Sequence, residues 1–214
     1  MRWKKISDAV VRRLPLYLRV LDDLAHKEKV KLISSQELGE LAGVSPALVR
    51  KDLAWFGEFG KQGVGYELEY LRHELRRILN LDVNHRVALI GVGSLGGALT
   101  RYNIRRYREN PDFNLHIVAL FDSDAELIGS EVEDVQIQPL DVLEQTVEDM
   151  GIEMAIITVP ASDAQTVAQR LVNAGVKAIL NFAPITLHVP DDVQVASADL
   201  TLELQRLAYY LVEE

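Results

Sequence analysis

A glycine-rich turn lies between an apolar stretch and a helical stretch, well inside the chain. Residues 87–99 read "VALIGVGSLGGAL", which predicts a buried strand, a tight turn and the first turns of a helix. This order is typical of the loop that receives a dinucleotide in a Rossmann-like domain. Because 86 residues precede the loop, we expect a second domain ahead of it.

Three glycines of this loop follow the spacing Gly-x-Gly-x-x-Gly. Gly91 permits the tight turn, Gly93 lets the backbone approach a pyrophosphate, and Gly96 lets the helix pack close to the sheet. The N–H groups at the start of the helix then attract phosphate oxygens. We therefore expect the whole loop to contact the cofactor, namely Gly91, Val92, Gly93, Ser94, Leu95 and Gly96.

An acidic residue follows where such a domain binds the ribose. The predicted strand 115–122, "LHIVALFD", ends in Asp122, whose carboxylate can accept hydrogen bonds from ribose hydroxyl groups. It would repel the 2′-phosphate of NADP, and no arginine follows closely, so the sequence favours NAD(H). The alternative is that the glycines serve packing alone and that Asp122 caps a loop.

The rest of the second half alternates between predicted strands and helices. Strands are predicted at 86–91, 115–122, 154–160, 177–182 and 193–199, and helices at 95–108, 139–150 and 161–175. Apolar strands separated by helices indicate an α/β fold with a parallel sheet covered on both faces. We expect a Rossmann-like NAD(H)-binding domain at 85–198. A last helix at 199–214 has apolar positions at Leu200, Leu204, Leu207 and Leu211.

The first half predicts a helix-turn-helix. Ser34 has capping-box spacing to Glu37, and Gly43 ends this first helix. Ser45 can cap the next helix, with Pro46 at its first position. Two short helices joined by a tight turn are typical of DNA-binding domains.

The flanking segments complete a winged-helix pattern. Four glycines in "GEFGKQGVGY" (57–66) predict a β-hairpin, and residues 67–81 predict a closing helix. Pro15 lies inside an apolar helical spacing, where it either kinks the helix or begins a new one. We therefore expect a winged-helix DNA-binding domain at 1–80.

Charge is divided unequally between the two halves. Residues 1–80 hold 15 Lys and Arg against 11 Asp and Glu, whereas residues 81–214 hold 8 against 21. A basic half favours contact with a polyanion, although an unequal surface charge between two domains is the simpler alternative.

Composition excludes several classes of protein. The chain has no cysteine, so disulfides, zinc–thiolate sites and thiol redox chemistry are excluded, and we expect no metal site. It has no apolar run long enough to cross a bilayer and no secretory signal. We expect a cytoplasmic protein without membrane contact.

The residues for hydride-transfer catalysis are not evident. A dehydrogenase needs a group that handles the substrate proton, and three of the five histidines lie before or at the first residue of the predicted nucleotide domain. His116 lies within a predicted strand, and His188 has no evident partner. We therefore expect no enzyme. A small NAD-dependent oxidoreductase with a helical extension, or a nucleotide-binding protein that contacts other proteins, remains the alternative.

Four segments together resemble one family. "RRLPLYLRVL", "VRKDLAWFGEFGKQGVGY", "LIGVGSLGGAL" and "LNFAP" closely resemble the Rex redox-sensing transcriptional repressors, in order and over essentially the whole chain. The resemblance implies a homodimer that binds palindromic operators of respiratory and fermentative genes. It implies that NADH releases the repressor from DNA while NAD+ permits binding. It also implies that the C-terminal helix, 199–214, is exchanged between subunits.

The resemblance assigns roles to individual residues. It implies that the helix beginning at Ser45 reads the major groove, and it extends the cofactor contacts beyond the glycine loop. The implied DNA contacts are Ser45, Ala47, Arg50, Lys51 and Lys61, and the further cofactor contacts are Tyr102, Val159, Pro160, Asn181 and Phe182. Many family members have Lys-Arg at the hairpin tip, where this chain has Lys61-Gln62, so one cation is missing. Without the resemblance, Arg50 and Lys51 also fit an ordinary solvated helix face.

Three further positions correspond to the family's switch. The resemblance implies that Asp199 pairs with Arg13 in one state and with Tyr102 in the NADH state. A carboxylate that exchanges partners gives a contact with two stable arrangements. The neutral nicotinamide of NADH tolerates an apolar pocket better than the cation of NAD+ does, which supplies a difference in affinity. The alternative is that Arg13 and Asp199 make unrelated surface pairs.

Overall fold

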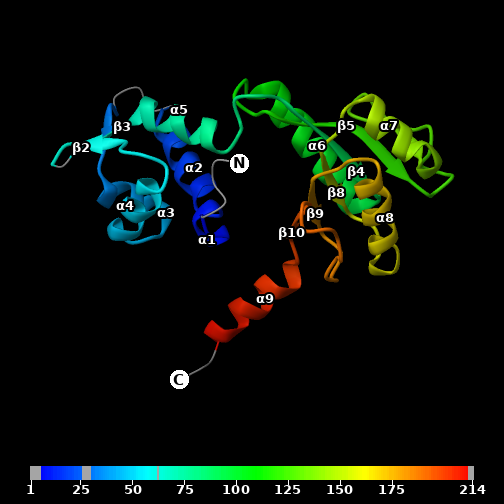
Figure 1. Cartoon of the computed structure of the whole chain (residues 1–214). Helices are drawn as coiled ribbons and strands as arrows, with labels where there is room; N and C mark the ends of the chain where they lie inside the picture. Colours follow the sequence, from blue (N-terminus) through cyan, green and yellow to red (C-terminus); the bar gives the residue numbers. More distant parts are fainter. Residues whose placement is uncertain (1–5, 26–29, 62, 212–214) are drawn as a thin grey trace. The chain divides into compact units, whose positions relative to one another are not determined.

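The chain divides into two compact units. The computed structural model describes residues 6–25, 30–61 and 63–211. Residues Met1–Val83 belong to the first unit and Asn84–Glu214 to the second. Figure 1 shows the first unit in blue to cyan and the second in green to red.

The first unit combines helices with a small antiparallel sheet. Its helices are α1 (Asp8–Val11), α2 (Leu14–Ala25), α3 (Ser35–Ala42), α4 (Pro46–Ala54) and α5 (Leu68–Ile78). Its strands β1 (Leu32–Ile33), β2 (Gly60–Lys61) and β3 (Gly65–Glu67) form a sheet in the order β1-β3-β2. The predicted hairpin is therefore confirmed, and β1 adds a third strand that the sequence did not predict.

The predicted helix boundaries around the turn are confirmed. The hydroxyl oxygen of Ser34 accepts a hydrogen bond from the Glu37 N–H at 3.1 Å, and Gly43 has φ +71°. The Ser45 hydroxyl oxygen accepts from the Leu48 N–H at 3.2 Å. These caps satisfy N–H groups that have no intrahelical partner and fix where α3 and α4 begin.

Proline decides how the first helical segment is divided. Pro15 is the second residue of α2, so it begins a new helix rather than kinking a longer one. The side chains of Tyr17, Leu21 and Leu38 are fully buried in the core of this unit. Leu53 from α4 and Leu71 from α5 pack in the same core, which joins α4 to its neighbours.

The second unit is a three-layer α/β structure. Its seven-stranded sheet has the order β10-β9-β8-β4-β5-β7-β6. The strands are β4 (His85–Ile90), β5 (Leu115–Asp122), β6 (Glu131–Val132), β7 (Val135–Pro139), β8 (Met154–Ile157), β9 (Ala178–Asn181) and β10 (Gln194–Ser197). All pairs are parallel except β6–β7.

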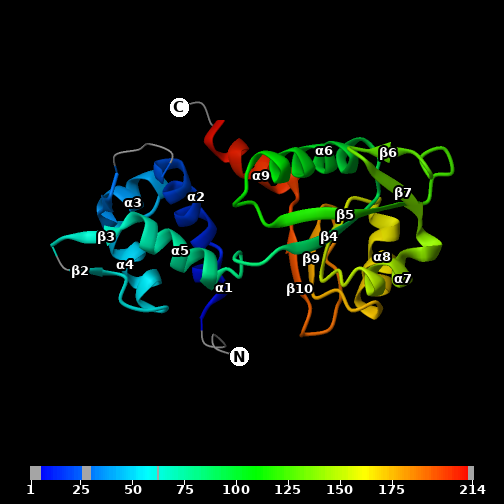
Figure 2. The ribbon, with the colours of Figure 1, turned by 90° about the horizontal axis from the view of Figure 1, so that it is seen from above.

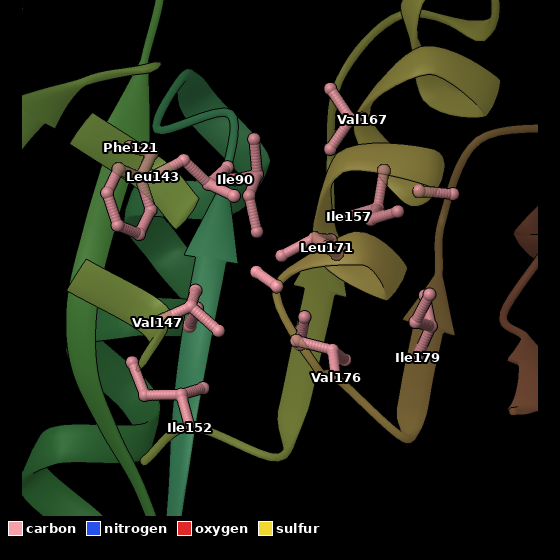
Figure 3. Packing of buried hydrophobic residues seen from close by; sticks show 14 of the residues in the cluster. Ile90, Phe121, Leu143, Val147, Ile152, Ile157, Val167, Leu171, Val176 and Ile179 are labelled. Atoms are coloured by element: carbon pink, nitrogen blue, oxygen red, sulfur yellow. The ribbon is translucent and has the colours of Figure 1, made fainter. Parts of the chain in front are cut away.

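Helices cover both faces of this sheet, as Figure 2 shows. One face carries α6 (Ser94–Glu109), and the other carries α7 (Leu143–Asp149) and α8 (Ala161–Asn173), with the short helix η1 (Leu140–Val142) before α7. Figure 3 shows the core on the α7–α8 face, where Ile90, Phe121 and Ile157 of the sheet meet Leu143 and Leu171 of the helices. The predicted Rossmann-like architecture is confirmed.

The last helix of the chain buries none of its side chains. Helix α9 (Leu200–Ala208) continues into η2 (Tyr209–Leu211). The exposed fractions of the predicted apolar positions are 66% for Leu200, 67% for Leu204, 50% for Leu207 and 80% for Leu211. Within the described residues, no helix is both long and apolar enough to cross a membrane.

Candidate functional site

The glycine loop joins β4 to α6 in a tight turn. Gly91 follows β4 with φ +94°, and a Cβ there would lie 2.8 Å from the backbone of Thr158. A Cβ on Gly96 would lie 1.9 Å from the carbonyl oxygen of Gly91. Packing therefore requires glycine at both positions, in agreement with the roles predicted for the turn and for the close approach of the helix.

Gly93 differs from its two neighbours in the motif. A Cβ on Gly93 would meet no heavy atom within 4 Å, and its φ of −61° is available to any residue. Gly93 precedes the first turn of α6, whose N–H groups have no acceptor within the helix. The space beside Gly93 and these N–H groups fit the pyrophosphate of a dinucleotide, which needs close backbone approach. Packing alone does not account for the motif.

Thr158, which the sequence analysis missed, holds the loop against the neighbouring strand. Its hydroxyl oxygen lies 2.7 Å from the carbonyl oxygen of Gly91 and 3.0 Å from that of Ile90. Thr158 follows β8, which pairs with β4 in the sheet. This contact cannot be predicted from the sequence unless the strand order is known, because 67 residues separate Thr158 from Gly91.

Asp122 lies beside the glycine loop, at the end of β5. Its Oδ2 accepts a hydrogen bond from the Val92 N–H at 2.5 Å, and its Oδ1 accepts from the Asp124 N–H at 2.9 Å. A carboxylate has about four lone-pair positions, so ribose hydroxyl groups can still bind to it. Asp122 thus fixes the loop and is also placed to bind a ribose.

The remaining predicted cofactor residues are distributed over three elements. Val159 and Pro160 connect β8 to α8, while Asn181 ends β9 and Phe182 follows it. All four lie at the carboxyl edge of the parallel sheet, which is where such sheets bind ligands. Tyr102 lies on α6 and is 60% exposed.

The side chain of Asn181 is committed to its own loop. It is fully buried, its Nδ2 donates to the carbonyl oxygens of Ala183 and Ile185 at 3.0 Å each, and its Oδ1 accepts from the Ala183 N–H at 3.0 Å. The side chain of Asn181 therefore shapes the loop after β9, and the cofactor contact at this position stays a prediction.

Helix α4 presents cations on one side and apolar residues on the other. Val49 and Leu53 are buried, whereas Arg50 and Lys51 are exposed, as are Ser45 and Ala47. The Nη1 of Arg50 donates a hydrogen bond to the Ser35 hydroxyl oxygen at 2.9 Å, which holds the guanidinium near the start of α3.

A hollow separates this helix from the hairpin. Its lining includes Ser35, Arg50, Lys61 and Tyr66, so cations from the helix and from the hairpin border the same space. Lys61 is exposed at the end of β2, and its carbonyl oxygen accepts from the Val64 N–H at 3.0 Å. Cations on a helix and on a wing are the arrangement that binds a phosphate backbone.

Arg13 pairs with a residue that the sequence analysis missed. Its Nε donates to Asp52 Oδ2 at 2.6 Å and its Nη2 to Asp52 Oδ1 at 2.8 Å. The Tyr17 hydroxyl also donates to Asp52 Oδ2, at 2.7 Å. Asp52 is 1% exposed on α4, and its only sequence signal is an acid between the buried positions Val49 and Leu53.

This cluster shifts the pKa values of all three groups. Burial alone would raise the pKa of Asp52, but the hydrogen bonds from Arg13 and Tyr17 outweigh it, so that pKa is lowered. The hydrogen bond to Asp52 raises the pKa of Arg13. Burial first, and then the hydrogen bond to Asp52, raise the pKa of Tyr17. The cluster therefore holds one negative and one positive charge at neutral pH.

The other two predicted switch residues also have partners within the chain. The Oδ1 of Asp199 accepts from the Thr201 N–H at 2.8 Å and so caps α9. The hydroxyl oxygen of Tyr102 accepts from Arg106 Nη1 at 2.6 Å.

No metal centre is evident in the part of the chain that the structure describes. Among residues 6–25, 30–61 and 63–211, His, Asp and Glu side chains form no group of three or more that could hold a metal ion.

Comparisons with known proteins cover both units. A model described as "CoA binding domain" matches residues 82–185, and one described as "Putative DNA-binding protein N-terminus" matches residues 5–54. The redox-sensing transcriptional repressor Rex of Brevibacillus brevis is 50% identical over 97% of this chain and 98% of its own length. The Rex repressor of Chloroflexus aggregans is 48% identical over 97% of this chain and 95% of its own length.

Solved structures agree with these relatives. A crystal structure of RSP in complex with β-NAD+ and operator DNA has a TM-score of 0.87 at 40% identity, over 96% of this chain and 92% of that chain. A crystal structure of RSP in complex with β-NADH has a TM-score of 0.84 at 38% identity, over 97% of this chain and 95% of that chain.

The fold and the site define a class of protein, in which a winged-helix DNA-binding unit is joined to a dinucleotide-binding Rossmann unit. Within that class, the chain belongs to the Rex family of redox-sensing transcriptional repressors. Members of this family are repressors rather than enzymes, which decides against the oxidoreductase alternative.

Proposed function

We propose that this protein is a homodimeric repressor that binds palindromic operator DNA in the cytoplasm and leaves it when NADH binds. The observation that carries the proposal is that one chain has both exposed cations on α4 and an open backbone at Gly93. We assign DNA binding to residues 1–80, NAD(H) binding to 85–198 and subunit exchange to 199–214. The RSP structures with NAD+, NADH and operator DNA support this assignment.

The second unit supplies the residues that hold NAD(H). The N–H groups at the start of α6 bind the pyrophosphate, and the backbone at Gly93 leaves room for it. Asp122 accepts hydrogen bonds from ribose hydroxyl groups and repels a 2′-phosphate. Val159, Pro160 and the loop shaped by Asn181 border the nicotinamide side. The bound cofactor supplies a ring that is positively charged only when it is oxidised.

The first unit supplies the DNA contacts. Arg50 and Lys51 reach guanine edges or phosphates in the major groove, and Lys61 contacts phosphates from the hairpin. Exchange of α9 between subunits buries leucines that are exposed in the single chain. In a two-fold symmetric dimer, two α4 helices would meet successive major grooves of an inverted repeat.

The switch links the two sites. Asp199 pairs with Arg13 in the DNA-binding state and with Tyr102 in the NADH-bound state, as the family resemblance implies. Both candidate partners carry side-chain N–H or O–H donors that suit a carboxylate. A ligand can shift this equilibrium only if it binds the two states with different affinity, and the nicotinamide charge provides that difference.

The decisive experiment measures DNA binding with each cofactor separately. The full chain, loaded with NAD+, selects duplexes from a random pool, and the selected duplex is then titrated by fluorescence anisotropy with NADH or NAD+ present. We expect an inverted repeat and a loss of affinity with NADH but not with NAD+. Equal release by both cofactors would overturn redox sensing, and a pool without an enriched duplex would overturn operator binding.

A further inference from the structure

The recognition helix contains a buried carboxylate on the side that faces away from its cations. Among the described residues, Asp52 and Glu74 are the buried acids, and Asp52 is the more buried, at 1% exposure against 9%. Asp52 directly follows Arg50 and Lys51 along α4. Because a helix of nine residues moves as a rigid body, a displacement at Asp52 also displaces these two cations.

Among the described residues, the side chains that bind this carboxylate come from the start of the chain. Arg13 precedes α2 and binds both carboxylate oxygens, while Tyr17 on α2 binds one of them. A buried ion pair is often no more stabilising than apolar residues of the same size, so the fold alone gives little reason for a charge here. In some proteins a buried charged pair fixes one arrangement of the elements that it joins, and here it joins α4 to Arg13.

Arg13 retains the capacity to bind a second acid. Its two bonds to Asp52 use two of the five N–H groups of a guanidinium, and its side chain is 22% exposed. A second carboxylate can therefore bind Arg13 without displacing the first. In the proposed switch, Asp199 is that second carboxylate.

We propose that Asp52 is the positioning residue through which Arg13 controls the recognition helix. When Asp199 binds Arg13, the guanidinium bridges two carboxylates and holds α4 in the orientation that reads DNA. When Asp199 leaves for Tyr102, Arg13 keeps its contact with Asp52, but Asp52 and α4 are no longer linked to Asp199 through the guanidinium. This inference rests on the proposed function, because it uses the exchange of Asp199.

The test is Asp52→Asn in the full chain, which keeps the shape of the side chain and removes its charge. The operator dissociation constant is measured with saturating NAD+ and with saturating NADH, and the ratio of the two reports coupling. We expect this ratio to fall on the order of tenfold, which corresponds to about 1.4 kcal/mol. NADH affinity, measured by its fluorescence, should stay within about twofold of wild type because the cofactor binds the other unit.

A purely structural role predicts a different result. In that case Asp52→Asn lowers the melting temperature and weakens DNA binding by the same factor with both cofactors, so an unchanged ratio overturns the inference. If this variant does not fold, Arg13→Lys replaces it, because lysine keeps the charge and loses the two-pronged contact. An unchanged ratio in Arg13→Lys would likewise overturn the inference.

A matched control distinguishes the loss of any ion pair from the loss of the Arg13–Asp52 pair. Arg170 binds both carboxylate oxygens of Glu144 in the second unit, at 2.5 and 2.6 Å, so Glu144→Gln removes a pair of the same chemistry. We expect its ratio to equal that of wild type. If the operator dissociation constants of the wild type with NADH and with NAD+ are equal, the proposed function itself is wrong. If they differ in the wild type and differ by the same factor in Asp52→Asn, only the inference about Asp52 is wrong.

Discussion

At the scale of single residues, the three glycines of the loop are required for different reasons. Gly91 and Gly96 lack side chains because other backbone atoms lie within 2.8 and 1.9 Å of where a Cβ would be. Gly93 has open space in the same place. The first two glycines are therefore required by the folded chain itself, and the third by what approaches it.

Substitution of Gly93 should separate binding from folding. In Gly93→Ala, the added methyl group meets no protein atom, so the melting temperature should be unchanged while NADH affinity falls on the order of tenfold. Calorimetry and NADH fluorescence titration measure the two effects. In Gly96→Ala, the methyl group collides with the Gly91 carbonyl, and stability should drop by about 1–3 kcal/mol. A stable Gly93→Ala protein with wild-type NADH affinity would contradict the assignment of this loop.

Asp122 should matter for the cofactor and not for DNA. Asp122→Ala removes a charged acceptor, which costs about 1.5–3 kcal/mol and predicts NADH binding weakened by roughly tenfold to a hundredfold. The DNA affinity of the cofactor-free protein, measured by anisotropy, should be unchanged because Asp122 lies in the second unit. Loss of DNA affinity without cofactor would contradict this division of labour.

At the scale of elements, the sequence predicts most reliably the segments whose pattern reflects local requirements. Strand β5 spans Leu115–Asp122 as predicted, because a central parallel strand is apolar along most of its length. The helix starts at Ser34 and Ser45 were predictable because capping depends on neighbours in sequence. Strand β6, at the edge of the sheet, and β7 beside it were missed, since both are short and partly polar.

Contacts between distant residues were not predictable in this way. Asp52 looks like one polar residue in a helix until the fold brings Arg13 and Tyr17 to it across 39 and 35 positions. Thr158 meets the glycine loop only because β8 lies beside β4. The glycine loop and Asp122 were predictable because the Rossmann pattern fixes their places relative to successive strands.

Helix α4 should bind DNA through its exposed cations. Arg50→Ala should weaken operator binding by about 1–3 kcal/mol if Arg50 contacts a base, or reduce the slope of log affinity against log salt by about one if it contacts a phosphate. NADH affinity should not change. Lys177→Ala, which removes an exposed cation of the second unit, serves as the control and should bind DNA as wild type does. Wild-type operator affinity in Arg50→Ala would remove this residue from the interface.

At the scale of the whole molecule, the end of the chain carries an exposed apolar surface on α9 and η2. Leu200, Leu202, Leu204 and Leu207 of α9 and Leu211 of η2 are each at least 50% exposed in the single chain. Apolar residues repeated along one element and left exposed mark an interaction surface. Exchange between two copies would bury them and would give the two-fold symmetry that an inverted repeat requires.

A charge on this helix should therefore dissociate the dimer. Leu204→Glu places a carboxylate among the exchanged leucines, and burial of an unpaired charge is costly. We expect light scattering coupled to size-exclusion chromatography to report a monomer, with operator affinity reduced at least on the order of tenfold. Gln205→Ala, on the same helix, should remain dimeric. A dimeric Leu204→Glu protein that binds its operator normally would rule out subunit exchange through α9.

The cap at the start of α9 has a mechanical consequence. Asp199 holds the first turn of this helix through the Thr201 N–H, and it is also the carboxylate proposed to change partners. Asp199 immediately precedes α9, so no flexible residue separates its side chain from the helix. Each exchange of partner would therefore strengthen or weaken the first turn of the helix that joins the two subunits in the proposed dimer.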